Sequence, residues 1–123
     1  MKTWPKYPVI YEINTWVWLN ELSRKYQRGV DLATVPPEEW DSIASRGFDA
    51  VWFMGVWERS PAGIEISMRN PGLLEDFRRA LSDFAAEDNV GSPYCVRRYM
   101  VDEHLGGPEG LAVARKELAQ RGI

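Results

Sequence analysis

The sequence has little that would support a disulfide framework, a metal cluster or a membrane anchor. Its 123 residues include one cysteine and one histidine. A single cysteine cannot form an internal disulfide or a multi-cysteine metal site. No run approaches the roughly 18 apolar residues that a membrane span needs, and the N-terminal MKTWPKYPVIYE lacks the apolar core of a signal peptide. We therefore expect a soluble, cytoplasmic protein with no membrane partner.

The chain also lacks an excess of positive charge, since its formal net charge is −3. Proteins that bind nucleic acid usually present a basic surface, so we expect no nucleic-acid partner. What is present is an ordinary globular balance, 45% hydrophobic and 27% charged, which argues against wholesale disorder. The length predicts one modest domain.

The first half of the chain has the pattern of a β-α-β unit. Residues 8–19 (PVIYEINTWVWL) are rich in β-branched and aromatic side chains, which predicts a strand with one nearly all-apolar face. Residues 20–33 are polar and predict a connection. Prolines and acids at the start of TVPPEEWDSIASRG and a glycine at its end predict a helix. Residues 48–57 (FDAVWFMGVW) are nearly all apolar, which is typical of a strand covered on both faces. Three tryptophans are then predicted to lie on strands in the core: Trp16, Trp18 and Trp52.

The second half is predicted to hold two helices separated by irregular chain. Residues 70–84 carry an amphipathic stripe, with Asn70 as the N-cap and Pro71 in the first turn. Residues 85–106 look irregular. Residues 106–122 predict a last helix, with Pro108 near its start and Gly122 as its stop.

The helix before FDAVWF ends in SRG and the last helix ends in QRG, followed by Ile123. A third strand is therefore expected where the chain stops. Two parallel strands alone leave open edges and unburied faces, and a complete (β/α)8 barrel needs about 250 residues. We expect an α/β chain whose residues 1–123 form the incomplete N-terminal portion of one (β/α)8 TIM barrel. It would comprise strands 1 and 2, their helices and the long second βα loop, with no separate second domain. The rest of the barrel would be required for a complete fold.

Three segments, in this order, resemble the start of glycoside hydrolase family 13, the α-amylase family. VIYEINTWVWL is similar to the family's first strand, with its Tyr-Glu/Gln-Ile core, and GFDAVWFMGVWERS is similar to the second. Residues 91–123 resemble the segment Gly-Tyr-x-Val-x-Asp-Tyr, then Ile-Asp-x-x-Phe/Leu-Gly, then a helix ending in Arg-Gly-Ile. The resemblance covers nearly the whole chain and implies a (β/α)8 glycosidase that acts on α-glucosidic bonds.

The resemblance departs from the family pattern in two respects. Arg98 stands where many members carry Asp before the tyrosine, here Tyr99. The family's Asp-x-x-x-Asn-His motif, its nucleophile Asp, its acid/base Glu and its second Asp belong to later strands. A retaining glycosidase needs two carboxyl groups about 5–5.5 Å apart, so we assign no catalytic residue here and expect the isolated chain to be inactive. Calcium is common in the family, but its usual ligands lie largely beyond this segment, so no cofactor or metal ligand is assigned.

Three residues are candidates for binding an α-glucan or oligosaccharide substrate. Tyr94 matches the family tyrosine that stacks on the sugar next to the cleavage point, and a phenol ring has the flat apolar face for this. Its alternative role is packing against the barrel rim. Trp57 follows the second strand and either shapes a sugar subsite or anchors the loop. Asp102 matches the family Asp after Ile/Val; the main expectation for it is a loop anchor held by hydrogen bonds.

Other polar residues carry weaker expectations. Glu58 and Arg59 are interpreted as a solvated pair, and Glu12 and Asn14 as structural groups that point into the barrel. His104, in a predicted loop, has no partner His or Cys for metal binding, so we expect no metal or catalytic role for it. Cys95, predicted to be half-buried, has no paired base that would make it a nucleophile.

Two alternatives stay open from the sequence. The chain could be a non-catalytic remnant that pairs its open strand edge with another chain. The complete protein could instead be a related transglycosidase, such as a sucrose phosphorylase or a trehalose-forming enzyme.

Overall fold

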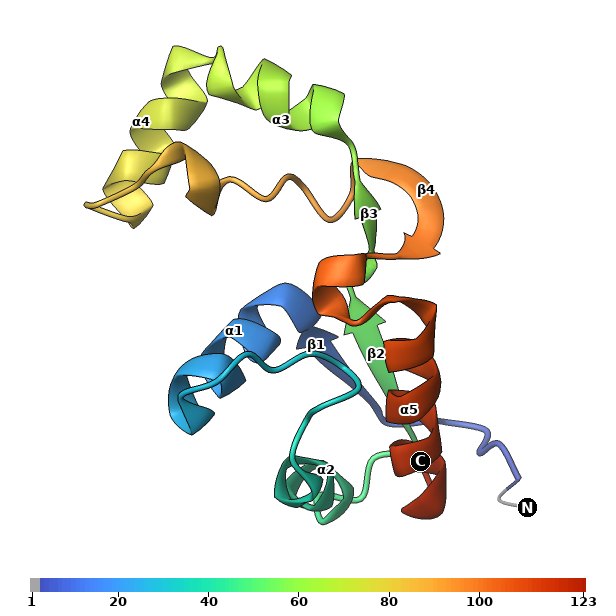
Figure 1. Ribbon diagram of the computed structural model, residues 1–123. Helices are drawn as coiled ribbons and strands as arrows, with labels where there is room; N and C mark the ends of the chain where they lie inside the picture. The colour runs from blue at the N-terminus through green and yellow to red at the C-terminus, as the bar shows by residue number, and fades with distance from the viewer. Residues whose placement is uncertain (1–2) are drawn as a thin grey trace. The chain divides into compact units, whose positions relative to one another are not determined.

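A computed structural model describes residues 3–123 and has a mixed α/β fold (Figure 1). Within these residues it contains five α-helices and two sheets of two strands each. The chain divides into two units, one running to Val56 and resuming at Met100, the other spanning Trp57–Tyr99. None of the helices in residues 3–123 combines the length and apolarity needed to cross a membrane.

The first unit is built on a parallel pair of strands. β1 (Ile10–Asn14) pairs with β2 (Ala50–Met54), in a register that runs from Ile10 opposite Ala50 to Asn14 opposite Met54. The predicted parallel pairing of these two strands is therefore confirmed, but the connection between them holds two helices where the sequence predicted one. Around the pair are grouped α1 (Thr15–Tyr26), α2 (Pro37–Ala44) and α5 (Gly107–Gln120), with a 3₁₀ turn, η2 (Glu103–Leu105), before α5 (Figure 1).

One face of the β1–β2 pair carries the core. Side chains alternate between faces along a strand, so Ile13 shares a face with Phe53. Ile13 is buried, and the ring of Phe53 lies 6.2 Å from that of Trp40 on α2, which is 1% exposed. Trp18 of α1 completes this aromatic cluster, 5.4 Å from Trp40. Trp40 is thus a central core residue.

The opposite face of the pair, the bare face, is mostly exposed. Ile10, Glu12 and Trp52 share it and are exposed, Trp52 by 53%, whereas Ala50 and Met54 on the same face are half-buried. The prediction that residues 48–57 form a strand covered on both faces, with Trp52 in the core, is therefore wrong for this chain. Continuous apolarity indicates that a face is suited to burial, but no described element covers this one.

The predicted strand over residues 8–19 is also wrong beyond Asn14. The chain turns into α1 at Thr15, and the buried residues of this helix are Thr15, Leu19 and Leu22. Their spacing of four and three residues is helical, whereas a strand would have buried alternate positions. Trp16 and Trp18 are half-buried helix residues, and part of the predicted connection over 20–33 is helix.

The second unit contains a short two-stranded sheet and two helices. Strand β3 (Trp57–Arg59) pairs with β4 (Val96–Val101), whose last two residues belong to the first unit. Between them lie α3 (Pro61–Met68), α4 (Pro71–Ala80) and a 3₁₀ turn, η1 (Ala86–Asp88). Residues 85–106, predicted to be irregular, therefore include a strand and two 3₁₀ turns.

Helix α4 begins as predicted but does not bury its stripe. The side chain of Asn70 accepts hydrogen bonds from the N–H groups of Gly72 and Leu73, which confirms it as the N-cap. The helix ends at Ala80, before the last residues of the predicted stripe. Leu73 and Leu81 are 38% and 43% exposed, so this stripe is a surface feature.

Candidate functional site

The candidate site is built on the β3–β4 ribbon of the second unit. At one end of the ribbon the N–H of Ser60 donates to the carbonyl of Cys95 (2.8 Å). Further along, the ring of Trp57 meets that of Tyr99 edge-on, with centroids 5.7 Å apart. Trp57 therefore has a packing partner in this ribbon and is half-buried.

Between these two contacts lies a charged cross-strand pair. The guanidinium of Arg98 donates twice to the carboxylate of Glu58, through Nε and Nη2, at 2.7 Å each. Arg97 lies 3.9 Å from the same carboxylate. The hydrogen bond from Arg98 lowers the pKa of Glu58 below its usual value of 4.5. A bidentate pair fixes direction as well as distance, so it holds the two strands in register.

The prediction that Glu58 and Arg59 form a solvated pair is wrong. Glu58 pairs with Arg98, and Arg59 donates from Nη1 to the carbonyl of Gly91 (2.7 Å). Gly91 has a φ of +87°, and a Cβ added there would lie 3.1 Å from Ile64 and 3.2 Å from Arg59. Glycine is therefore required at this turn, just ahead of Tyr94.

Tyr94 follows the turn at Gly91 that these contacts hold in place. Its side chain is 80% exposed, and its backbone N–H donates to Oγ of Ser92 (3.2 Å). No other ring in residues 3–123 stacks on it. Cys95 next to it is exposed, which corrects the predicted half-buried position. The ribbon thus presents a free phenol face on a turn tied down at Gly91 and Cys95.

Asp102 belongs to the first unit and acts there as a backbone anchor. Its Oδ1 accepts the N–H of His104 (2.8 Å), which caps η2, and its own N–H donates to the carbonyl of Val56 (2.9 Å). The N–H of Gly107 donates to its carbonyl at 3.1 Å. The three bonds fix the chain between β4 and α5.

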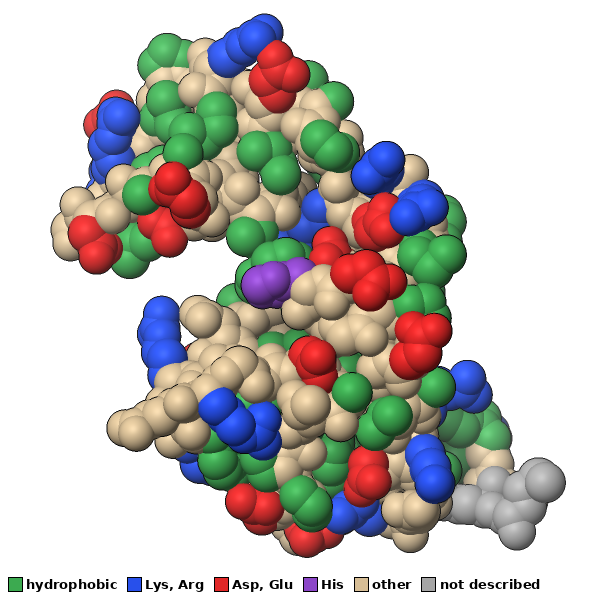
Figure 2. Space-filling model, viewed as in Figure 1, with side chains coloured by type: hydrophobic (Ala, Val, Ile, Leu, Met, Phe, Trp, Pro, Cys, Tyr) green, Lys and Arg blue, Asp and Glu red, His purple; other side chains and the backbone are tan. Residues whose placement is uncertain are grey.

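Sequence reasoning missed a ring pair at the carboxyl end of β1. Trp16, in the first turn of α1, stacks on His104 with centroids 4.7 Å apart and planes within 10°. The single histidine is exposed at the surface, where Figure 2 shows it in purple. A strand reading of residues 8–19 could not place Trp16 here. Glu12 and Asn14, expected to be structural, are exposed on β1.

The two carboxylates of the candidate site are engaged in contacts within the chain. The carboxylate of Glu58 is held by Arg98, and that of Asp102 caps a turn. Across residues 3–123 no group of three or more His, Cys, Asp or Glu side chains is placed to hold a metal ion. Comparison with protein-family models, with curated proteins and with solved structures found no match to this chain.

Proposed function

We propose that this chain is the N-terminal part of an α-amylase-type glycoside hydrolase and supplies the first two strands of its (β/α)8 barrel. The observation that carries the proposal is the one-sided cover of the β1–β2 pair. Helices cover the face of Ile13 and Phe53, while Ile10 and Trp52 lie exposed on the other face. In a (β/α)8 barrel the helices lie outside the strands, and the opposite face fills the barrel interior. The first two strands of such a barrel would expose this face if the other strands were absent.

The three resembling segments give the proposal its substrate class, α-glucans or oligosaccharides. Tyr94 would stack its exposed ring on the sugar next to the cleaved bond, since a phenol ring covers the C–H face of a sugar. The Glu58–Arg98 pair would position it by holding the ribbon that carries it. Trp57, packed on Tyr99, would line the sugar site or support its wall. Asp102 would hold the following turn.

The chemistry would be supplied by groups outside these residues. Family members use a carboxylate nucleophile and a carboxylic acid, and form a glycosyl-enzyme intermediate that is then hydrolysed or transferred. Hydrolysis and transfer, as in sucrose phosphorylases or trehalose-forming enzymes, share this barrel start. Calcium, common in the family, would find its ligands outside the residues described.

The test is an activity assay on two proteins, the 123-residue chain and the product of the complete reading frame, with maltoheptaose, sucrose and trehalose as substrates. We expect no turnover by the chain and retention of anomeric configuration by the complete product. In the complete product, Tyr94→Ala should raise KM or lower kcat by at least about tenfold. Tyr7→Ala removes an equally exposed ring (79%) outside the ribbon and serves as the control. Turnover by the chain alone, or wild-type kinetics for Tyr94→Ala, would contradict the proposal.

A further inference from the structure

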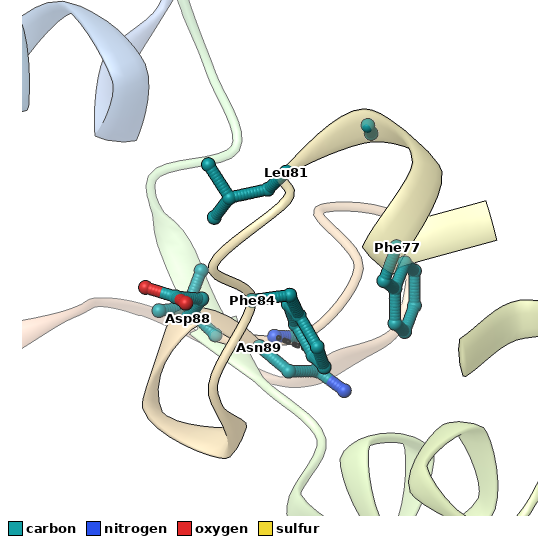
Figure 3. A pocket seen from close by; sticks show the side chains of 8 residues that line it. Phe77, Leu81, Phe84, Asp88 and Asn89 are labelled. Atoms are coloured by element: carbon teal, nitrogen blue, oxygen red, sulfur yellow. Dashed lines mark hydrogen bonds between the residues drawn. The ribbon is translucent and has the colours of Figure 1, made fainter. Parts of the chain in front are cut away.

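The second unit has a pocket that the proposed function does not use. It measures about 290 Å³ and lies between the end of α4, the η1 turn and the chain leading to Gly91 (Figure 3). Its apolar wall includes Phe77 and Phe84, whose ring centroids are 5.3 Å apart with planes tilted by 42°. The lining residues are Phe77, Ala80, Leu81, Phe84, Asp88, Asn89, Val90 and Gly91.

Local hydrogen bonds form the pocket and hold it open. Leu81 leaves the helix in an extended conformation, and its carbonyl accepts the N–H of Phe84 (3.0 Å), which folds the Phe84 ring back beside Phe77. On the other side Asn89 donates from Nδ2 to Oγ of Ser67 (2.9 Å) and accepts the N–H of Gly91 (3.2 Å). The apolar surface is thus exposed by a fixed turn, and Leu81 remains 43% exposed.

Three carboxylates lie on the chain around the pocket, those of Asp83, Glu87 and Asp88. Arg78 precedes them on α4, and Arg59 donates from Nη1 to the carbonyl of the lining residue Gly91. None of the three carboxylates forms an ion pair with a residue in 3–123. Asp88 lines the pocket itself and accepts the N–H of Ala85 through Oδ2 (2.8 Å). Asp88 is exposed, and its Oδ1 accepts no hydrogen bond from a described residue.

We propose that this pocket binds a small organic ammonium ion. The apolar body would lie against Phe77, Leu81 and Phe84, and the ammonium would donate to Oδ1 of Asp88. Aromatic faces also attract a cation through their quadrupole, which adds to the carboxylate contact. The volume suits a ligand on the order of ten non-hydrogen atoms, at the small end of ligand pockets. The carboxylate of Asp88 disfavours anions of the same shape.

This inference does not rest on the proposed glycosidase function and is tested on the 123-residue chain. The probe is 2-phenylethylammonium, followed by two-dimensional ¹H–¹⁵N NMR in about 0.15 M salt, where the screening length is about 8 Å. A ligand of this size in a shallow pocket should bind with a Kd on the order of 1 mM. The shifted amides should be those of Phe84, Asp88 and Gly91. The neutral isostere 2-phenylethanol should bind at least about tenfold more weakly, since it lacks the charge.

Matched variants separate the carboxylate from general electrostatics. Asp88→Asn keeps an oxygen for the N–H of Ala85 but removes the charge, and should weaken 2-phenylethylammonium at least about tenfold. Glu87→Gln removes a neighbouring charge that does not line the pocket and should change Kd by less than about twofold. Phe84→Leu keeps an apolar side chain and should weaken the ammonium more than the alcohol. Equal binding of ammonium and alcohol, an unchanged Kd in Asp88→Asn, or shifts confined to other residues would overturn the proposal.

Discussion

Truncating two tryptophans, one on each face of the β1–β2 pair, tests the division between core and bare surface. Trp40 is 1% exposed and packs against Trp18 and Phe53. Trp52 lies on β2 and is 53% exposed. Both changes to alanine remove the same atoms, so the difference between their losses in free energy of unfolding reports how deeply each side chain is buried.

The expected magnitudes follow from burial. Truncating a fully buried tryptophan costs about 3–5 kcal/mol, part of it for the cavity left behind. At Trp52 roughly half of the side chain faces solvent, and water fills the space left, so only about half of the transfer cost applies and the cavity cost is absent. We expect a loss of roughly 3–5 kcal/mol for Trp40→Ala and roughly 1–2 kcal/mol for Trp52→Ala.

The measurement is urea unfolding of the chain followed by far-ultraviolet circular dichroism, at a concentration where it remains monomeric. The m-value should be the same for both variants and the wild type, because the same surface becomes exposed. Equal losses at the two positions, or a larger loss at Trp52, would refute the reasoning. If the chain is the first part of a barrel, as proposed, the bare face is covered in the complete protein, and there Trp52→Ala should cost as much as Trp40→Ala.

Three further predictions use the same unfolding assay. Arg98 lowers the pKa of Glu58 below 4.5, so the ion pair stabilises the folded chain above that pH and the stabilisation is lost as pH falls through the lowered pKa. The wild type should therefore lose more stability on acidification than Glu58→Gln. Equal losses would mean that the pair contributes nothing to stability. Gly106→Ala should cost roughly 1–3 kcal/mol, since φ is +113° and a Cβ would lie 3.3 Å from the backbone of Leu32, whereas Gly29→Ala, with open space around it, should stay within about 0.5 kcal/mol. Tyr94→Ala should leave the midpoint unchanged because the ring is 80% exposed, and a clear loss would indicate that it packs against its unit.

Local patterns predicted the elements whose own residues decide their structure. Proline and acids at the start of α2, the Asn70 cap of α4 and the proline near the start of α5 all lie where the sequence placed them. The parallel pair was also predictable, because a helix connects two apolar runs. Helix starts depend on residues within one helical turn, and the parallel pairing depends on a single connection between two strands.

Helix α1 was missed because its sequence is compatible with two periodicities. Alternate residues in 8–19 are apolar, but Thr15, Leu19 and Leu22 also have helical spacing. Burial of Leu19 and Leu22 in the first unit favours the helix, so tertiary packing overrode β propensity. Asn14 before the turn was a local indication of a helix start, although its side chain accepts no capping hydrogen bond.

The contacts of the candidate site depend on long-range pairing and were not predictable. Glu58 and Arg98 are 40 residues apart, and their pair follows from how β3 aligns with β4. The stack of Trp16 on His104 likewise requires α1 and η2 to be placed first. The motif residue Tyr94 could be singled out by resemblance, but its exposure and its support by Gly91 come from the structure.

The most direct test of the proposed function is to read the coding sequence past the codon for Ile123. We expect an open frame that encodes an apolar strand ending in Asp-x-x-x-Asn-His, followed by further strands with an Asp and a Glu at their carboxyl ends. Those residues would supply the two carboxyl groups that retaining glycosidases require. A stop codon directly after Ile123 would contradict the proposal that this chain is the first part of a catalytic barrel.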